Sequence, residues 1–203
     1  MMRRPVGDRL VVATHNAGKL AEMRALFAPF GVTLVSAGEL GLPEPEETEA
    51  TFLGNARIKA HAAARATGEA ALGDDSGLEV EALDGAPGVY TANWAELAGG
   101  RDFAYAMRRT HDALRTAEAA LPWRARFRCT LVLAWPDGAE AVFDGMVAGQ
   151  LVWPIRGREG HGYDPMFQPD GSDLTFAEMS DEKKNAMSHR AKAFQAMIER
   201  CFT

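Results

Sequence analysis

Residues 10–20, Leu-Val-Val-Ala-Thr-His-Asn-Ala-Gly-Lys-Leu, are the stretch that decides the fold. The four apolar residues Leu10–Ala13 predict a short buried strand that stops at polar residues. Beyond Gly18 the apolar residues follow helical spacing instead, which predicts a helix closed by Gly31. The apolar stripe of this helix consists of Leu20, Met23, Leu26, Phe27 and Phe30. The chain therefore opens with a strand, a polar turn and a helix.

The rest of the chain repeats this mixture of strand and helix patterns. Further strands are predicted at residues 32–35, 70–73, 125–133 and 139–147, the last two as a hairpin around Pro136-Asp137-Gly138. Helices are predicted at about residues 51–67 and 101–119 and at the C-terminus, where Met187, Ala191, Phe194, Ile198 and Cys201 form the apolar stripe. Residues 157–173 are predicted to be a glycine-rich loop. The pattern indicates a single α/β domain, residues 1–203, with a mixed sheet.

Composition excludes several classes of protein. The chain has 203 residues, a net charge of −6 and a pI of about 5.4, so we expect no nucleic-acid partner. It has no 18-residue apolar run and no signal-peptide pattern, so we expect no membrane association and a cytoplasmic location. Two cysteines, Cys129 and Cys201, are too few for a disulfide framework and are expected to be buried thiols.

The turn Thr14–Lys19 is a candidate phosphate site. Gly18 lets the backbone approach a ligand closely, and a helix N-terminus offers unpaired N–H groups and partial positive charge. Lys19 adds a full charge, and Thr14 and Asn16 add donors. The alternative is an N-capped turn with a solvated lysine. The spacing does not match a Walker A motif, which disfavours a P-loop kinase.

Two pairs of acidic residues are candidate metal ligands. Glu46 and Glu47 lie in an acidic, proline-broken loop, whereas Asp74 and Asp75 follow the strand at 70–73. Ser76 and Gly77 then predict a tight turn that exposes the pair. One carboxylate from each pair, completed by waters and phosphates, suits Mg²⁺. Acidic loops are more commonly only solvated, but two adjacent carboxylates at a buried strand end need a cation or donors.

Two later segments carry candidate groups for binding a nucleobase. Residues 157–165, Gly-Arg-Glu-Gly-His-Gly-Tyr-Asp-Pro, offer the rings of His161 and Tyr163 for stacking, and Asp164 to read a base edge. The alternative is a plain surface loop. In the C-terminal segment, Lys184, His189 and Arg190 lie off the apolar stripe and are available to a ligand, although the pattern of His189 taken alone favours a capping or structural role.

Together these segments resemble one family, the non-canonical purine nucleoside triphosphate pyrophosphatases, or inosine/xanthosine triphosphatase group. The motifs occur in the family's order from about residue 10 to about residue 192. The matching segments are Ala13–Lys19, Glu46-Glu47-Thr48 leading to Thr51–Ala56, Asp74–Leu78, Ala86–Tyr90, Gly160–Pro165 and Ser188-His189-Arg190.

The resemblance implies hydrolysis of a nucleoside triphosphate to the monophosphate and pyrophosphate. It also implies an elongated mixed sheet with flanking helices, two lobes around a central active-site cleft, and a homodimer. In such a protein Asp75 is the general base and a ligand of Mg²⁺, and Glu46 is the second ligand, with Glu47 as its nearest competitor. The substrate-binding residues implied are Thr14, His15, Asn16, Ala17, Gly18 and Lys19 for the triphosphate, Ser76 for a further contact, and His161, Gly162, Tyr163, Asp164, Lys184, His189 and Arg190 for the base.

Three residues depart from the family pattern. His15 stands where a glycine is common, His161 where a phenylalanine is usual, and Lys183 where an acidic residue is common. The first two bear on substrate preference. Two other functions remain open: a pyrophosphatase for modified pyrimidine or methylated guanine nucleotides, as in the related septum-formation-inhibitor group, and a non-catalytic nucleotide- or RNA-binding regulator.

Overall fold

The computed structural model describes residues 8–201, and the chain divides into two compact units. Among the described residues, the first unit comprises 8–75, 129–145 and 192–201, and the second comprises 76–128 and 146–191. The main sheet has six strands, in the spatial order β2 (Thr33–Ser36), β1 (Arg9–Val12), β3 (Ala71–Val80), β6 (Trp123–Ala134), β7 (Glu140–Leu151) and β8 (Phe167–Pro169). Strand β1 is parallel to β2 and β3, and β7 is antiparallel to β8. This confirms the predicted mixed α/β sheet. Three strands, β3, β6 and β7, contribute residues to both units.

The first unit contains the strand, turn and helix that open the chain. Its elements are β1 (Arg9–Val12), α1 (Ala17–Phe27), β2 (Thr33–Ser36), α2 (Phe52–Thr67), the first half of β3 (Ala71–Val80), and parts of β6 (Trp123–Ala134), β7 (Glu140–Leu151) and α5 (His189–Cys201). The boundaries predicted for β1, α1, β2 and α2 are within a few residues of those observed, whereas the strand predicted at 70–73 continues to Val80. A 3-10 turn, Ala28–Phe30, follows α1, and Gly31 at φ 67° closes it as predicted.

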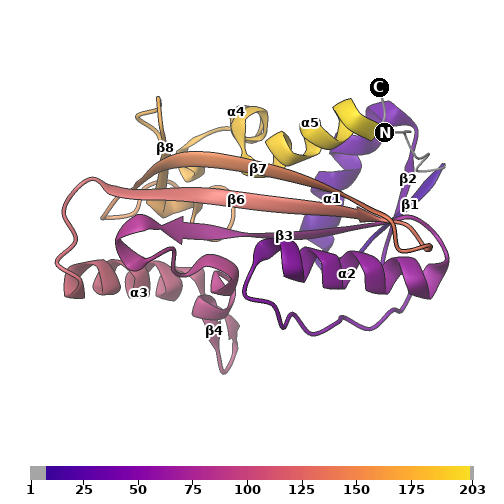
Figure 1. The fold of residues 1–203 in the computed structure, drawn as a ribbon. Helices are drawn as coiled ribbons and strands as arrows, with labels where there is room; N and C mark the ends of the chain where they lie inside the picture. The colour runs from indigo at the N-terminus through magenta and orange to yellow at the C-terminus, as the bar shows by residue number, and fades with distance from the viewer. Residues whose placement is uncertain (1–7, 202–203) are drawn as a thin grey trace. The chain divides into compact units, whose positions relative to one another are not determined.

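Helices cover both faces of the sheet in the first unit (Figure 1). On one face, α1 and α5 pack against Leu10, Leu72 and Leu131. On the other, the alanine-rich stripe of α2 packs against Val11, Ala71 and Val132. The predicted single apolar face of β6 is therefore wrong beyond Cys129, because α2 buries the second face as well.

The second unit has one core, formed by the remainder of β3, β6 and β7 with α3 (Phe103–Thr116). The hairpin β4 (Glu96–Leu97) and β5 (Gly100–Arg101) leads into α3, which confirms the helix predicted near 101–119. The loop predicted at 157–173 is wrong in part, because it contains a 3-10 turn at Asp164–Met166 and the strand β8 (Phe167–Pro169).

The C-terminal segment forms two helices where one was predicted. Ser188 separates α4 (Asp181–Met187) from α5 and accepts a hydrogen bond from the Ala191 amide, as a helix-capping serine does. The buried side chains of α5 are Ala193, Phe194, Met197 and Ile198. Cys129 is buried as predicted, whereas Cys201 is only partly buried. No helix in the described part of the chain is long and apolar enough to cross a membrane.

Candidate active site

The turn at Thr14–Lys19 forms the N-terminus of α1. Asn16 is the N-cap residue, and its Oδ1 accepts a hydrogen bond from the Lys19 amide at 3.1 Å. The hydroxyl of Thr14, which is buried, accepts one from the Asn16 amide. The helix begins at Ala17 with no acidic residue in its first turn, so its leading amides and partial positive charge are directed at this turn. The two interpretations of this turn, an N-capped helix start and an anion-binding site, are therefore compatible.

Asp74 and Asp75 lie inside a strand and not in a turn. The ten-residue strand β3 continues through residues 74–77, so the tight turn predicted there is wrong. Both side chains are buried, with 3% and 7% of their residue surface exposed, while Ser76 is partly buried. Adjacent residues of a strand face opposite sides of the sheet, so the two carboxylates have different surroundings.

Each buried carboxylate is compensated by side chains from its own side of the sheet. Asp74 forms an ion pair with Lys19 of α1, with 2.8 Å between Oδ2 and Nζ. Asp75 accepts a hydrogen bond from Asn55 of α2 at 3.2 Å, and its Oδ1 lies 4.0 Å from Nζ of Lys59. Lys59, also 7% exposed, forms a 2.8 Å ion pair with Glu47.

A close approach of α2 to β3 brings these groups together. A Cβ on Gly73 would lie 2.7 Å from the amide nitrogen of Ala60 and would clash with the carbonyl oxygen of Ala56. Only glycine at position 73 therefore lets the helix backbone rest on the strand. This contact places Asn55 and Lys59, one helical turn apart, over Asp75.

The charge state of Asp75 is set mainly by burial. Burial raises the pKa of Asp75 from its ordinary 3.8 to about 6, against the opposing effect of Lys59. Glu47 and Asp74 add to the rise, whereas the hydrogen bond from Asn55 lowers it. For Lys59, burial favours the neutral amine, but Asp74, Asp75 and Glu47 outweigh it and raise the pKa of Lys59. The result is an ionised lysine beside a carboxylate that titrates near neutral pH, a combination common in catalytic sites.

The two glutamates of the acidic loop differ in their positions. Glu47 reaches Lys59 and influences Asp75, whereas Glu46 is exposed and makes no such contact. Among residues 8–201, no group of three or more His, Cys, Asp or Glu side chains is arranged to hold a metal ion. Two carboxylates, Glu47 and Asp75, around one shared lysine fit a cation that takes its other ligands from water and phosphate.

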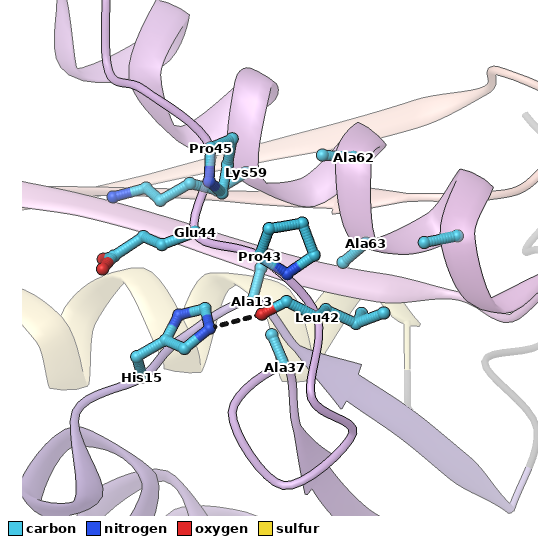
Figure 2. Close-up of a pocket in the computed structure, with 11 residues that line it drawn as sticks. Ala13, His15, Ala37, Leu42, Pro43, Glu44, Pro45, Lys59, Ala62 and Ala63 are labelled. Atoms are coloured by element: carbon cyan, nitrogen blue, oxygen red, sulfur yellow. Dashed lines mark hydrogen bonds between the residues drawn. The ribbon is translucent and has the colours of Figure 1, made fainter.

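His15 contacts the acidic loop through its side chain. Its Nε2 lies 2.8 Å from the carbonyl oxygen of Leu42, so the imidazole donates a hydrogen bond to the acidic loop (Figure 2). The ring borders a small pocket of about 120 Å³ within the first unit. The pocket is lined by Ala13, His15, Ala37, Leu42, Pro43, Glu44, Pro45, Lys59, Ala62, Ala63 and Ala66.

In the second unit, a buried aspartate organises the glycine-rich loop. Asp164, 4% exposed, accepts hydrogen bonds through Oδ2 from the His161 amide at 2.6 Å and from the ammonium of Lys184 on α4. Gly160 has φ 79°, and a side chain there would clash with the Asp164 carboxylate. Asp164 therefore shapes the loop, and the side chain of His161 is exposed.

Tyr163 belongs to the core of the second unit. Its ring is 1% exposed and packs edge-on against Phe103, with 6.1 Å between centroids. The apolar surroundings of α3 bury the ring, and burial also raises the pKa of Tyr163. Its contact with a base stays a prediction. Further along the chain, the ring of His189 is stacked on that of Phe127, with 5.0 Å between the ring centroids. The next residue, Arg190, is partly buried.

Reasoning from the sequence missed Lys59 as a site residue. The signal was present in α2, whose buried stripe is otherwise made of Phe52 and alanines but contains Asn55 and Lys59 at a spacing of four. A polar pair at that spacing within a buried stripe requires partners, which the carboxylates provide.

The fold and this cluster define a class: α/β proteins in which a capped helix start lies beside buried carboxylates and lysines at a central strand. The chain belongs to the Ham1 family, whose model matches residues 10–200. A protein of Ruegeria pomeroyi named dITP/XTP pyrophosphatase is 64% identical over 196 residues, covering 97% of this chain and 96% of that protein. One of Agrobacterium fabrum with the same name is 54% identical over 211 residues, covering 98% and 99%.

Solved structures agree with this membership. The structure of a HAM1 protein from Coxiella burnetii superposes with a TM-score of 0.87 at 36% identity, covering 93% of this chain and 95% of that one. A nucleoside-triphosphatase / dITP/XTP pyrophosphatase from Mycobacterium abscessus gives a TM-score of 0.74 at 37% identity, covering 93% and 97%. The family resemblance inferred from the motifs is thereby confirmed.

Proposed function

We propose that this protein is a nucleoside triphosphate pyrophosphatase that hydrolyses dITP, ITP and XTP to the monophosphate and pyrophosphate. The names of its relatives support this reaction. The observation that carries it is Asp75, a buried carboxylate with a pKa of about 6 beside Lys59, next in the strand to Asp74, which pairs with Lys19 at the start of α1. Such a carboxylate is ionised at neutral pH yet basic enough to accept a proton.

In the proposed reaction Asp75 takes a proton from a water molecule, and the water oxygen attacks the α-phosphorus. The bond between the α-phosphorus and the bridging oxygen breaks, and pyrophosphate leaves with that oxygen. Lys19 and Lys59 stabilise the negative charge that develops on the phosphates, and the leading amides of α1 bind phosphate oxygens. Phosphoryl chemistry needs mainly such positioning and electrostatic stabilisation.

We propose Mg²⁺ as the metal, with Glu47 and Asp75 as its protein ligands. The ion pair of Glu47 with Lys59 supports Glu47 over Glu46, because only Glu47 makes a contact within the cluster. When bound, the metal would neutralise phosphate charge and help to orient the triphosphate.

The second unit is proposed to bind the base. His161 offers an exposed ring, and Lys184, His189 and Arg190 offer donors to the oxo groups of hypoxanthine and xanthine. Adenine carries an amino group at the corresponding position and would leave such donors unpaired, which opposes ATP and dATP.

A homodimer is part of the proposal. Tyr90, Leu97 and Tyr105 are large apolar side chains of the second unit with 57%, 47% and 38% of their surface exposed. Exposed apolar groups close in sequence are typical of subunit interfaces. Light scattering coupled to size-exclusion chromatography gives the mass in solution, and a monomer at micromolar concentration would contradict the dimer.

A pyrophosphate-release assay tests the reaction. Triphosphates of hypoxanthine, xanthine, adenine, guanine, a modified pyrimidine and a methylated guanine are compared with and without Mg²⁺. We expect dITP, ITP and XTP to be hydrolysed much faster than dATP or dGTP, and only with the metal. Preference for the pyrimidine or methylated guanine would indicate the septum-formation-inhibitor type of activity, and binding without hydrolysis would indicate a regulator.

A further inference from the structure

The acidic loop, residues 41–49, spans a cavity. Its first half, Leu42–Pro45, forms one wall of the 120 Å³ pocket, and the facing wall consists mainly of the small side chains of Ala62, Ala63 and Ala66 (Figure 2). Two prolines in this stretch have no amide hydrogen to donate. Alanines opposite the loop leave space, so packing alone does not fix its position.

The loop is instead held at separate points along its length. Leu42 donates its amide to the Ala37 carbonyl, and Glu49 donates its amide to Asn55 Oδ1 at 2.9 Å. Between them, Glu47 pairs with Lys59. Near the N-terminal end of the loop, the Leu42 carbonyl accepts a hydrogen bond from the side chain of His15, which belongs to the phosphate turn.

The imidazole borders the segment that leads into the loop. A Cβ added at Gly38 would lie 3.5 Å from Cδ2 and 3.6 Å from Cα of His15, which is van der Waals distance, so the ring lies beside this segment. The hydrogen bond to Leu42 joins two groups that are 27 positions apart in the sequence.

We propose that His15 is a positioning residue that holds the acidic loop against the phosphate turn and thereby keeps Glu47 at Lys59 and Asp75. The metal-binding part of this inference rests on the proposed function, because Glu47 is there assigned as a ligand. The ring acts through the loop and makes its contact with Leu42 and not with the substrate.

Two variants separate the hydrogen bond from the bulk of the ring. His15→Leu keeps a side chain against Gly38 but removes the donor, and His15→Gln restores an amide donor of similar reach. In metal-free protein, hydrogen exchange of residues 42–49 is followed on the millisecond-to-second scale. We expect faster exchange in His15→Leu, recovery in His15→Gln, and no change in residues 103–116 of α3, which report on whether the variants fold.

The second readout is the Mg²⁺ concentration for half-maximal hydrolysis of dITP. Loss of one hydrogen bond of ordinary net strength predicts a rise of about threefold to tenfold in His15→Leu, larger than any change in the KM for dITP. Unchanged exchange in residues 42–49 would overturn the proposal. A rise confined to the KM for dITP, with the Mg²⁺ dependence unaltered, would also overturn it, since His15 would then contact substrate.

The two proposals fail in different ways. A wild-type protein inactive towards every triphosphate would overturn the proposed function. The exchange data, which need neither metal nor substrate, would then decide by themselves whether His15 holds the loop.

Discussion

Replacing Asp75 by asparagine is expected to stabilise the protein and abolish its activity at the same time. The carboxylate is buried, and its pKa is raised from 3.8 to about 6, so ionising it in the folded state is unfavourable. Each pKa unit corresponds to about 1.4 kcal/mol, and a difference of about two units gives about 3 kcal/mol. An asparagine at this position has no charge to bury and can still bond to Asn55.

The pH dependence follows from the direction of this shift. Below pH 3.8 the carboxyl is protonated in both the folded and unfolded chain and has no effect. As the pH rises from about 3.8 to 6, the unfolded chain loses its proton first, so the stability of the folded state falls. Above pH 6 the full loss of about 3 kcal/mol is present.

Urea and thermal denaturation in EDTA test this reasoning. At pH 7.5 the Asp75→Asn variant should gain up to about 3 kcal/mol of unfolding free energy, or roughly 6–12 °C in Tm, and the gain should shrink towards zero near pH 4. Pyrophosphate release should fall by about 10²–10⁴-fold. Asp112→Asn, at a side chain 79% exposed, is the matched control and should change neither the unfolding free energy nor the rate of pyrophosphate release. A variant that is less stable than wild type at every pH would refute the argument.

Four further outcomes are expected. Lys59→Met removes the cation shared by two carboxylates, so hydrolysis should fall at least about 100-fold and Tm should drop; retained turnover would exclude Lys59 from the chemistry. Gly73→Ala inserts a methyl group against the backbone of α2 and should cost about 1–3 kcal/mol in urea unfolding, whereas Gly99→Ala, with nothing within 4 Å, should be neutral; equal effects would refute the close contact. Lys184→Met leaves the buried Asp164 carboxylate without its ion pair, so the KM for dITP should rise more than kcat falls, and an unaltered KM would contradict a role in binding the base. EDTA should abolish hydrolysis by the wild-type protein and added Mg²⁺ should restore it; activity that survives chelation would argue against the metal.

Local patterns in the sequence were sufficient for much of the fold. The apolar run before Thr14, the helical stripe after Gly18 and the alanine-rich stretch closed by Gly68 predicted β1, α1 and α2 with errors of a few residues. These elements are fixed by hydrophobic periodicity and capping residues, which act within a few positions of the chain. The predictions were wrong at residues 74–77 and 164–169, where polar residues and glycines are held in strands or turns by partners distant in sequence.

The candidate site, like the fold, depends partly on local sequence patterns and partly on contacts between residues distant in sequence. The sequence identified Lys19, Asp74 and Asp75 as candidate functional residues. It left open whether Glu46 or Glu47 is the metal ligand. Our proposal that Glu47 is the metal ligand is supported by its ion pair with Lys59, twelve residues further on, in which 2.8 Å separate Nζ from Oε1. The choice depends on the path of a loop across a cavity, which no local pattern encodes.

The sequence by itself determined the strand–turn–helix at residues 10–20, the α/β class and the family to which the motifs belong. The tertiary structure alone decided what surrounds each carboxylate. Because neighbouring residues of β3 face opposite sides of the sheet, Asp74 meets Lys19 of α1 and Asp75 meets Asn55 and Lys59 of α2. The close approach of α2, permitted by the missing side chain at Gly73, places Asn55 and Lys59 over Asp75, and burial at this position raises the pKa of Asp75 to about 6.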